Sequence, residues 1–326
     1  MNKKVHNHLL PRMVIKRWES ANGKIFSKSD ESSSSRSVKH YDYSKPYYYS
    51  LGKEDSLLED RISLFEAYVG ELFKKINEAN DSIIISEKDM EILKLYVILQ
   101  SCRNENTSSY IKSDESDIYR NNNYIQGVPL LSSQEDVVEF TNSVCDEFER
   151  IKNIGDGYDY SYDYKIFNPK CLNSYLSFGL HLVIVSNSTN SFMVSETTAV
   201  IECTMDGDYL YTYVPISPKI GLMLVKSRYF IDKEKIEYTK IRFGNKYGNG
   251  FPDPWLSHAI RDKKLIYNGK TENHLVTLDI VKLSTFEIYC LNSVIYEDGK
   301  RILYCNEEAL EKAKSPNGAR EVYLSY

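Results

Sequence analysis

The sequence predicts an α+β fold, with an N-terminal helical region followed by a mainly antiparallel sheet and a C-terminal helix. Apolar residues recur every three or four positions in three segments, at about residues 55–77, 86–104 and 133–153, as they do in amphipathic helices. In the second half of the chain they alternate with polar residues, as they do in strands. A tyrosine- and aspartate-rich stretch over residues 155–164 separates the two patterns. We therefore expect a single domain over residues 1–326, with a helix-rich part at 1–154 and a sheet-rich part at 155–326.

The first expected element is a short helix near the N-terminus. Pro11 suits the first helical position, where its missing N–H costs nothing. Val14 and Trp18 then lie on one face of the helix. An extended segment is expected to begin at residues 24–26, and the serine run Ser32–Ser35 is expected to form a loop.

Three amphipathic helices are predicted next. The first covers residues 55–77, and the second begins after the N-cap residue Ser86 and reaches about residue 104. The third covers residues 133–153. Residues 104–127 are polar and aperiodic, which indicates a long loop or a lid between the second and third helices.

Strands dominate the prediction for the second half of the chain. A two-residue period predicts four of them, at residues 180–186, 192–203, 209–216 and 220–226. The pair Asp206-Gly207 is typical of a tight hairpin turn between two strands. A last helix is expected at residues 306–314.

Composition narrows the classes of protein to which the chain can belong. The net charge is −5 and 42% of the residues are hydrophobic, as in a globular protein. No stretch approaches the roughly 20 apolar residues that a membrane span needs, and no apolar run follows Lys3 and Lys4 as in a signal peptide. The six cysteines form no Cys-x-x-Cys or Cys/His cluster, so we expect no zinc site and reduced thiols in a cytoplasm.

Charge is distributed unevenly along the chain. Residues 1–24 carry a formal +5 and residues 226–270 a formal +6, so the remainder carries −16. Basic segments of this kind can focus an anionic partner, such as nucleic acid, a nucleotide or an acidic protein, onto one face. They can equally pair with the acidic helices between them, and the sequence leaves both interpretations open.

Two candidate site residues lie in the N-terminal segment. His8 titrates near neutral pH, so it can act as a general acid or base. Arg17 can clamp a phosphate or a carboxylate. The alternative for His8 is a structural role, in which a ring nitrogen bonds a backbone carbonyl and anchors the N-terminus.

A second candidate group interrupts the apolar face of the helix that ends near residue 104. Gln100 and Arg103 stand where the core-facing stripe continues. A buried arginine needs a carboxylate, and Glu66 or Glu59 on the preceding helix is the natural partner. Such a pair either ties the two helices together or lines a polar pocket that faces a ligand.

The third candidate is Ser195-Glu196, within the predicted strand at 192–203. An acid inside an apolar strand can place a metal ligand or a base at the edge of a sheet, or it can simply face solvent. No Gly-rich phosphate loop, Gly-x-Ser-x-Gly elbow or His-Glu-x-x-His motif occurs in the sequence.

Several short motifs follow one another in a distinctive order. They are His8-Leu9-Leu10-Pro11 leading to Lys16-Arg17-Trp18, Leu58-Glu59, Phe65-Glu66, Leu99-Gln100 with Arg103, Phe192-Met193-Val194-Ser195-Glu196 and Val214-Pro215-Ile216-Ser217-Pro218, with a weaker echo at Leu291-Asn292. Their order over residues 6–226 resembles that of a bacterial family catalogued only as a domain of unknown function, number four-two-three-eight. The family's Ser-Asp-x-Pro motif is Ser195-Glu196-Thr197-Thr198 here, one methylene longer and without the proline.

The resemblance implies no activity, but it groups the polar positions already singled out. Polar residues that belong to one motif set often converge on one pocket, and this is the expectation for His8, Glu66, Gln100, Arg103 and Ser195-Glu196.

Two classes of function fit these observations. The first is a hydrolase of the nuclease or phosphohydrolase kind that acts on nucleic acid or a nucleotide, as a bacterial defence protein or toxin does. Its catalytic groups would be His8, Glu66 and Glu196, and its substrate-binding groups Arg17, Gln100, Arg103 and Ser195. Carboxylates suit Mg²⁺ or Mn²⁺, although the sequence selects no metal.

The second class is a non-enzymatic sensor or protein-interaction module. In that case the same polar residues are structural, and the basic segments bind an acidic partner.

Overall fold

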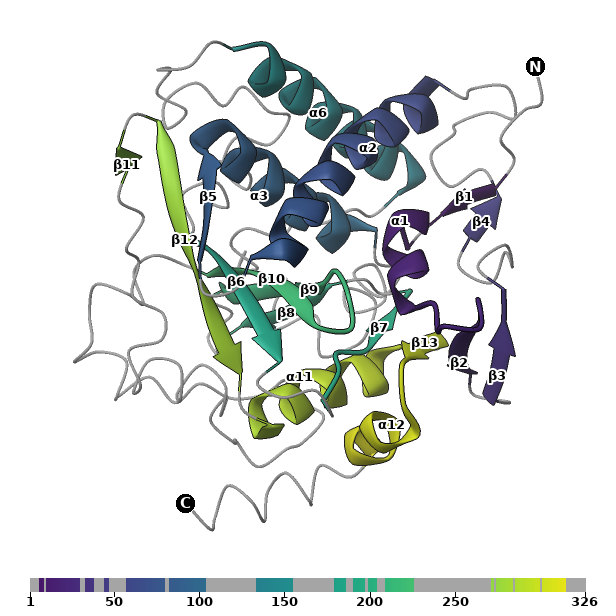
Figure 1. Cartoon of the computed structure of the whole chain (residues 1–326). Coiled ribbons are helices and arrows are strands. Elements are labelled where there is room, and N and C mark those ends of the chain that lie inside the picture. Colours follow the sequence, from purple (N-terminus) through teal and green to yellow (C-terminus); the bar gives the residue numbers. More distant parts are fainter. Residues whose placement is uncertain are drawn as a thin grey trace.

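A computed structural model of the chain shows how these elements are arranged in space (Figure 1). It describes residues 6–8, 10–29, 33–37, 44–46, 57–79, 82–103, 133–154, 179–185, 190–196, 199–203, 209–225, 271–272, 274–283, 285–299 and 301–314. Helices and largely antiparallel sheets combine in these residues, with helices early in the chain and one near its C-terminal end, so the α+β class is confirmed.

The predicted helices form close to the expected positions. They are α1 (Arg12–Ile15), the 3-10 turn η1 (Lys16–Trp18), α2 (Leu57–Glu78), α3 (Glu87–Cys102) and α6 (Gln134–Asn153). The Ser86 hydroxyl accepts a hydrogen bond from the Asp89 N–H at 3.0 Å, which confirms the predicted cap of α3. Ser133 and Asp136 form a reciprocal capping box at the start of α6.

The first helix begins one residue later than predicted. Pro11 has an extended backbone, with ψ at 133°, and stands as the N-cap one residue before the helix rather than inside it. His8 belongs to strand β1 (His6–His8), which pairs with β4 (Ser44–Pro46).

The larger sheet draws strands from both halves of the sequence. Its members are β5 (Ser82–Ser86), β6 (Gly179–Val185), β8 (Val200–Cys203), β9 (Tyr209–Pro215), β10 (Ile220–Val225), β11 (Thr271–Glu272) and β12 (Leu275–Leu283). The main order is β11-β12-β6-β10-β9-β8, and β5 pairs with β12. All pairings are antiparallel except that of β12 with β6.

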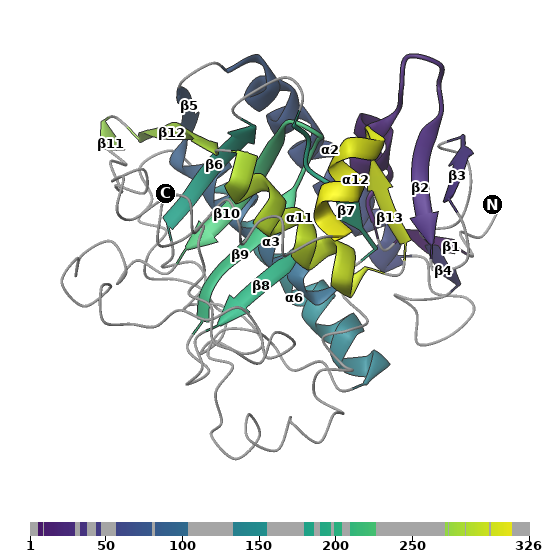
Figure 2. The ribbon, with the colours of Figure 1, turned by 90° about the horizontal axis from the view of Figure 1, so that it is seen from below.

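This sheet is buried on both faces. Figures 1 and 2 show α2, α3 and α6 on one side and α11 (Thr285–Asp298) and α12 (Glu307–Lys314) on the other. Leu222 and Leu224 of β10 join the core that contains α3, whereas Met223 between them joins the core that contains α11. The two-residue period of a strand therefore supplies two hydrophobic cores at once.

A four-stranded sheet lies beside it, in the order β3-β2-β13-β7. Its strands are β2 (Ile25–Ser29), β3 (Ser33–Arg36), β13 (Arg301–Tyr304) and β7 (Val194–Ser195). The expected extended segment near residue 25 is thus confirmed as β2. The serine run predicted to be a loop is largely strand β3, because it pairs with β2, and the Ser27 and Ser34 hydroxyls hydrogen-bond across the pair at 3.0 Å.

The prediction of one strand over residues 192–203 is wrong. The segment splits into β7, which pairs with β13, and β8, which pairs with β9 in the other sheet. Each part has a separate partner far along the chain, and these partners decide where the strand breaks.

Other expectations concern residues outside those that the structure describes. They are the loop or lid at 104–127, the tyrosine-rich stretch at 155–164 and the turn at Asp206-Gly207. The division into parts at 1–154 and 155–326 stays a prediction. Among the helices described, none is long and apolar enough to cross a membrane.

Candidate functional site

A group of polar side chains gathers around Tyr96 on one face of α3. Tyr96, Gln100 and Arg103 stand four and then three positions apart, so they share that face. Tyr96 and Gln100 are fully buried, and Arg103 is 1% exposed. The sequence prediction that the polar residues continue the core-facing stripe is confirmed.

Glu66 of α2 pairs with Arg103. The Arg103 guanidinium donates through Nη1 to Glu66 Oε1 at 2.6 Å, and the Glu66 side chain is 21% exposed. The predicted tie between the two helices is therefore present. It joins a buried cation to a carboxylate that still reaches solvent, and removal of that carboxylate would leave the guanidinium buried without its counter-charge.

Arg17 approaches the same tyrosine from η1. Its guanidinium lies 5.4 Å from the centre of the Phe73 ring, a cation–π contact, and it interacts electrostatically with the Tyr96 phenol. Burial lowers the pKa of Arg17 below its usual value. Because the ordinary pKa of an arginine side chain is far above neutral, Arg17 keeps its charge at neutral pH.

Tyr96 itself is a neutral hydrogen-bond donor. Burial raises the pKa of its phenol well above the usual value, and Glu66 raises it further, while Arg103 and Arg17 act in the opposite direction. Within the part of the chain that the structure describes, its hydroxyl has no hydrogen-bond partner. We call Arg17, Glu66, Tyr96, Gln100 and Arg103 the Tyr96 cluster. Two cations, one carboxylate and one phenol suit an anionic ligand.

Ser195 and Glu196 are not members of the Tyr96 cluster, which lies on η1, α2 and α3: Ser195 ends strand β7 of the four-stranded sheet, and Glu196 follows it in a turn. Ser195 is 2% exposed and packs on Gly299, where an added Cβ would lie 2.5 Å from Ser195 Cβ. Glu196 Oε2 accepts a hydrogen bond from the Arg301 backbone N–H at 2.8 Å. These contacts tie β7 to β13 and to the end of α11.

The backbone of His8 pairs with that of Ser44, but its side chain lies outside the described part of the chain. Its proposed role as an acid or base stays a prediction. Among the described side chains, no three His, Cys, Asp or Glu residues gather closely enough to hold a metal ion.

Sequence reasoning missed two buried polar links between distant segments. The Trp18 indole donates to the Phe192 carbonyl at 3.3 Å. Asn292 Nδ2 donates to the Ser191 carbonyl and Asn292 Oδ1 accepts from the Met193 N–H, both at 2.9 Å. In the sequence, these links are indicated only by a tryptophan and an asparagine among apolar residues. Such residues do not identify the backbone groups to which they will bond.

The turn at Pro215–Pro218 is closed by its own serine. Ser217 Oγ accepts hydrogen bonds from the N–H groups of Lys219 and Ile220, at 3.2 and 3.0 Å. This motif therefore has a local structural role, typical of serine in turns.

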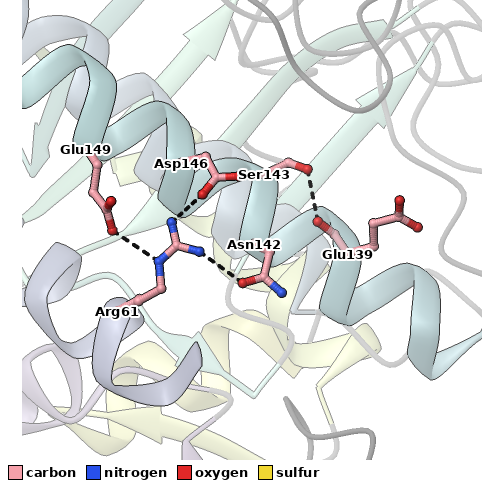
Figure 3. Close-up of polar contacts among 6 residues, drawn as sticks. All are labelled: Arg61, Glu139, Asn142, Ser143, Asp146 and Glu149. Atoms are coloured by element: carbon pink, nitrogen blue, oxygen red, sulfur yellow. Dashed lines mark hydrogen bonds and ion pairs between the residues drawn. The ribbon is translucent and has the colours of Figure 1, made fainter. Parts of the chain in front are cut away.

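A further polar cluster, which the sequence did not single out, joins α2 to α6 (Figure 3). Arg61 donates to Asn142, Asp146 and Glu149, which lie along one face of α6, at 3.0, 2.5 and 3.0 Å. Partial burial lowers the pKa of Arg61, but the hydrogen bonds to Asp146 and Glu149 outweigh burial and raise it overall. Because both carboxylates are exposed to solvent, this cluster orients two helices rather than forming an enclosed site.

Comparison with known proteins gives one match. A family model described as "Protein of unknown function (DUF4238)" matches residues 6–308. Neither the curated proteins nor the solved structures contain a match to this chain.

Proposed function

The chain belongs to the DUF4238 family, and because that family's description names no activity, we propose a function from the side chains themselves. The protein is a hydrolase of the nuclease or phosphohydrolase kind, and its substrate is a nucleic acid or a nucleotide. One observation carries the proposal: Arg17, Glu66 and Arg103 approach the same buried tyrosine from three different elements.

Four members of the cluster have a role in this reaction. Arg17 and Arg103 offset the negative charge of the phosphoryl oxygens. Glu66, whose carboxylate is partly exposed, takes a proton from the water that attacks phosphorus. The bond to the leaving oxygen breaks, and that oxygen takes a proton from His8 or from solvent. Gln100 orients the substrate, whereas Ser195 and Glu196, which were candidates from the sequence, have no part in this proposal.

We place this activity in the bacterial cytoplasm, in a defence protein or a toxin. The widely spread cysteines, with no Cys-x-x-Cys motif, support the cytoplasmic part of that placement. The proposal assigns no role to Mg²⁺ or Mn²⁺; whether hydrolysis depends on either ion is tested in the assay.

The test is a hydrolysis screen of the full chain on RNA, DNA and nucleotides, with Mg²⁺, with Mn²⁺ and with a chelator. Glu66→Gln should lower kcat by about a hundredfold or more, since a positioned general base contributes at least that factor. Glu71→Gln is the matched control, because Glu71 lies on the same helix and its ion pair with Lys74 is exposed. Absence of turnover on every substrate, or equal kcat for wild type and Glu66→Gln, overturns the proposal.

A second candidate function is a non-enzymatic sensor or protein-interaction module that binds an acidic partner. The near-complete burial of Arg103 and the structural contacts of Ser195 and Asn292 favour it. It predicts that the wild-type protein hydrolyses none of the substrates. It also predicts that Glu66→Gln has a lower melting temperature than the wild type.

A further inference from the structure

The Tyr96 ring is held in place by packing, while its hydroxyl has no hydrogen-bond partner among the described residues. Its ring makes edge-on contacts with Phe65 and Phe73, with centroids 6.4 and 5.2 Å away. The hydroxyl oxygen is buried and makes no hydrogen bond within the described residues. A buried donor in this state is costly, so its presence beside two arginines calls for a physical reason.

The charged members of the Tyr96 cluster are two cations and one carboxylate. Arg103 has Glu66 as a counter-ion at 2.6 Å. Arg17 contacts the Phe73 ring, and no described carboxylate forms an ion pair with it. The cluster itself therefore carries one net positive charge beside the Tyr96 hydroxyl, which makes no hydrogen bond within the described residues.

We propose that the Tyr96 cluster binds a terminal phosphate group, with phosphate oxygens between Arg17 and Arg103 and one of them accepting a hydrogen bond from the Tyr96 hydroxyl. The inference rests on the proposed function and names the substrate class of that site: a phosphate monoester, such as a nucleotide or a phosphorylated strand end. When no ligand is present, the Glu66 carboxylate forms the ion pair with Arg103. A bound phosphate takes the place of that carboxylate beside the Arg103 guanidinium.

Burial favours an end group over an internal phosphodiester. Tyr96 is fully buried and Arg103 is 1% exposed, while the partly exposed Glu66 and Arg17 form the side that solvent reaches. A terminal phosphate can enter from that side with its ester group pointing outward. An internal phosphodiester carries a sugar on both sides, and one of them would have to be buried among Phe65, Phe73 and Tyr96. A monoester is also close to a dianion at neutral pH, which matches two guanidinium groups.

Binding to the full chain tests this, because it is measured without turnover. The probes are inorganic phosphate, a nucleoside 5′-monophosphate, a dinucleoside phosphodiester without a terminal phosphate, and sodium chloride at equal ionic strength. Phosphate and the monophosphate should raise the melting temperature and compete for one site by calorimetry. The phosphodiester and the chloride should not.

Two variants separate a binding role for Tyr96 from a packing role. Tyr96→Phe keeps the ring and should weaken phosphate binding by about tenfold or more, the value of a hydrogen bond to a charged group. Tyr213→Phe is the matched control, because Tyr213 is also fully buried and its hydroxyl likewise makes no hydrogen bond to the described part of the chain, but it lies in the other core. It should bind phosphate as the wild type does. Arg17→Gln, a change at a partly exposed residue, should weaken binding whether or not Tyr96→Phe folds.

Glu66→Gln tests the exchange of anions. Without ligand this variant should melt at a lower temperature than the wild type, because it loses the carboxylate on Arg103. Phosphate should then raise its melting temperature by more than it raises that of the wild type.

The inference is overturned if the phosphodiester binds as well as the monoester, if Tyr96→Phe binds phosphate unchanged, or if Glu66→Gln gains no larger shift. These outcomes are distinct from failure of the proposed function. Phosphate binding that depends on Tyr96, without turnover of any substrate, retains this site and rejects the hydrolase. Turnover that depends on Glu66, with binding unaffected by Tyr96→Phe, retains the hydrolase and rejects this site.

Discussion

Asn292 shows how a single buried side chain can connect segments about a hundred residues apart. Its amide donates to the Ser191 carbonyl and accepts from the Met193 N–H, so it satisfies two backbone groups of the segment that leads into β7. Ser191 and Met193 lie just before β7 and outside any strand, so the Asn292 side chain supplies hydrogen bonds of the kind that a neighbouring strand supplies elsewhere.

Asn292→Ala should destabilise the protein by about 2–6 kcal/mol, because each orphaned buried backbone group costs about 1–3 kcal/mol. Urea unfolding monitored by circular dichroism measures this change. Ser293→Ala on the same helix is the control and should cost less than about 1 kcal/mol, since its hydroxyl only bonds back to the Tyr289 carbonyl. Equal stability of the two variants would contradict the role given to Asn292.

At the residue scale, the sequence revealed polar groups but not their partners. Gln100 and Arg103 were identifiable because polar side chains stand out on an apolar stripe, and the proposal of Glu66 as partner followed from helix adjacency. Tyr96 was not identifiable, because a tyrosine on such a stripe is indistinguishable from an ordinary core residue. Glu196 illustrates the same limit, because an acid next to a strand gives no sign of the Arg301 backbone N–H that it meets in the structure.

At the level of elements, helix positions followed from local rules and strand partners did not. The start of α3 was predicted from Ser86, because a cap is a contact between residues three apart, and Ser133 caps α6 in the same way in the structure. The break between β7 and β8 depends on which distant strand each one meets, and no local pattern reports that.

Two glycines provide a test of packing at this scale. Gly221 of β10 lies under the Tyr213 ring, where an added Cβ would stand 2.3 Å from Tyr213 Cε2. Gly221→Ala should therefore cost about 1–3 kcal/mol through overpacking. Gly70 of α2 meets only the flexible end of Met13, at 3.3 Å. Gly70→Ala should stabilise the protein by up to about 1 kcal/mol through helix propensity.

Thermal and urea unfolding of the two glycine variants measure these opposite effects. A stabilising Gly221→Ala would mean that the Tyr213 ring moves aside easily. That result would contradict the inference that this core is tightly packed.

On the scale of the whole molecule, the two halves of the sequence complete each other's sheets. β5 pairs with β12, and β2 pairs with β13. The core on the α3 side likewise contains residues from Leu10 to Leu303. When it is alone, the first half loses β12 and β13 as partners of β5 and β2. The second half keeps most of its strand pairings but loses α2, α3 and α6, which cover one face of its sheet.

The fragments 1–154 and 155–326, expressed separately, should show no cooperative melting transition, whereas co-expression should restore one. Trp18 is buried and bonded to Phe192 across this division, so its fluorescence should report the restored contact. The intact chain should melt in one transition by fluorescence and by circular dichroism. Cooperative melting of either fragment alone would contradict the interdependence of the halves.

The sequence by itself determined the fold class, the positions of the amphipathic helices and the polar residues that interrupt their apolar faces. These features depend on contacts a few residues apart, and periodicity and capping reveal such contacts directly. Only the tertiary structure decided that β7 and β8 lie in different sheets, that Glu196 binds the Arg301 backbone, and that Arg17, Glu66 and Arg103 meet around Tyr96. Each of these depends on packing between segments that are distant in the chain, and local sequence patterns carry no record of which distant surfaces fit together.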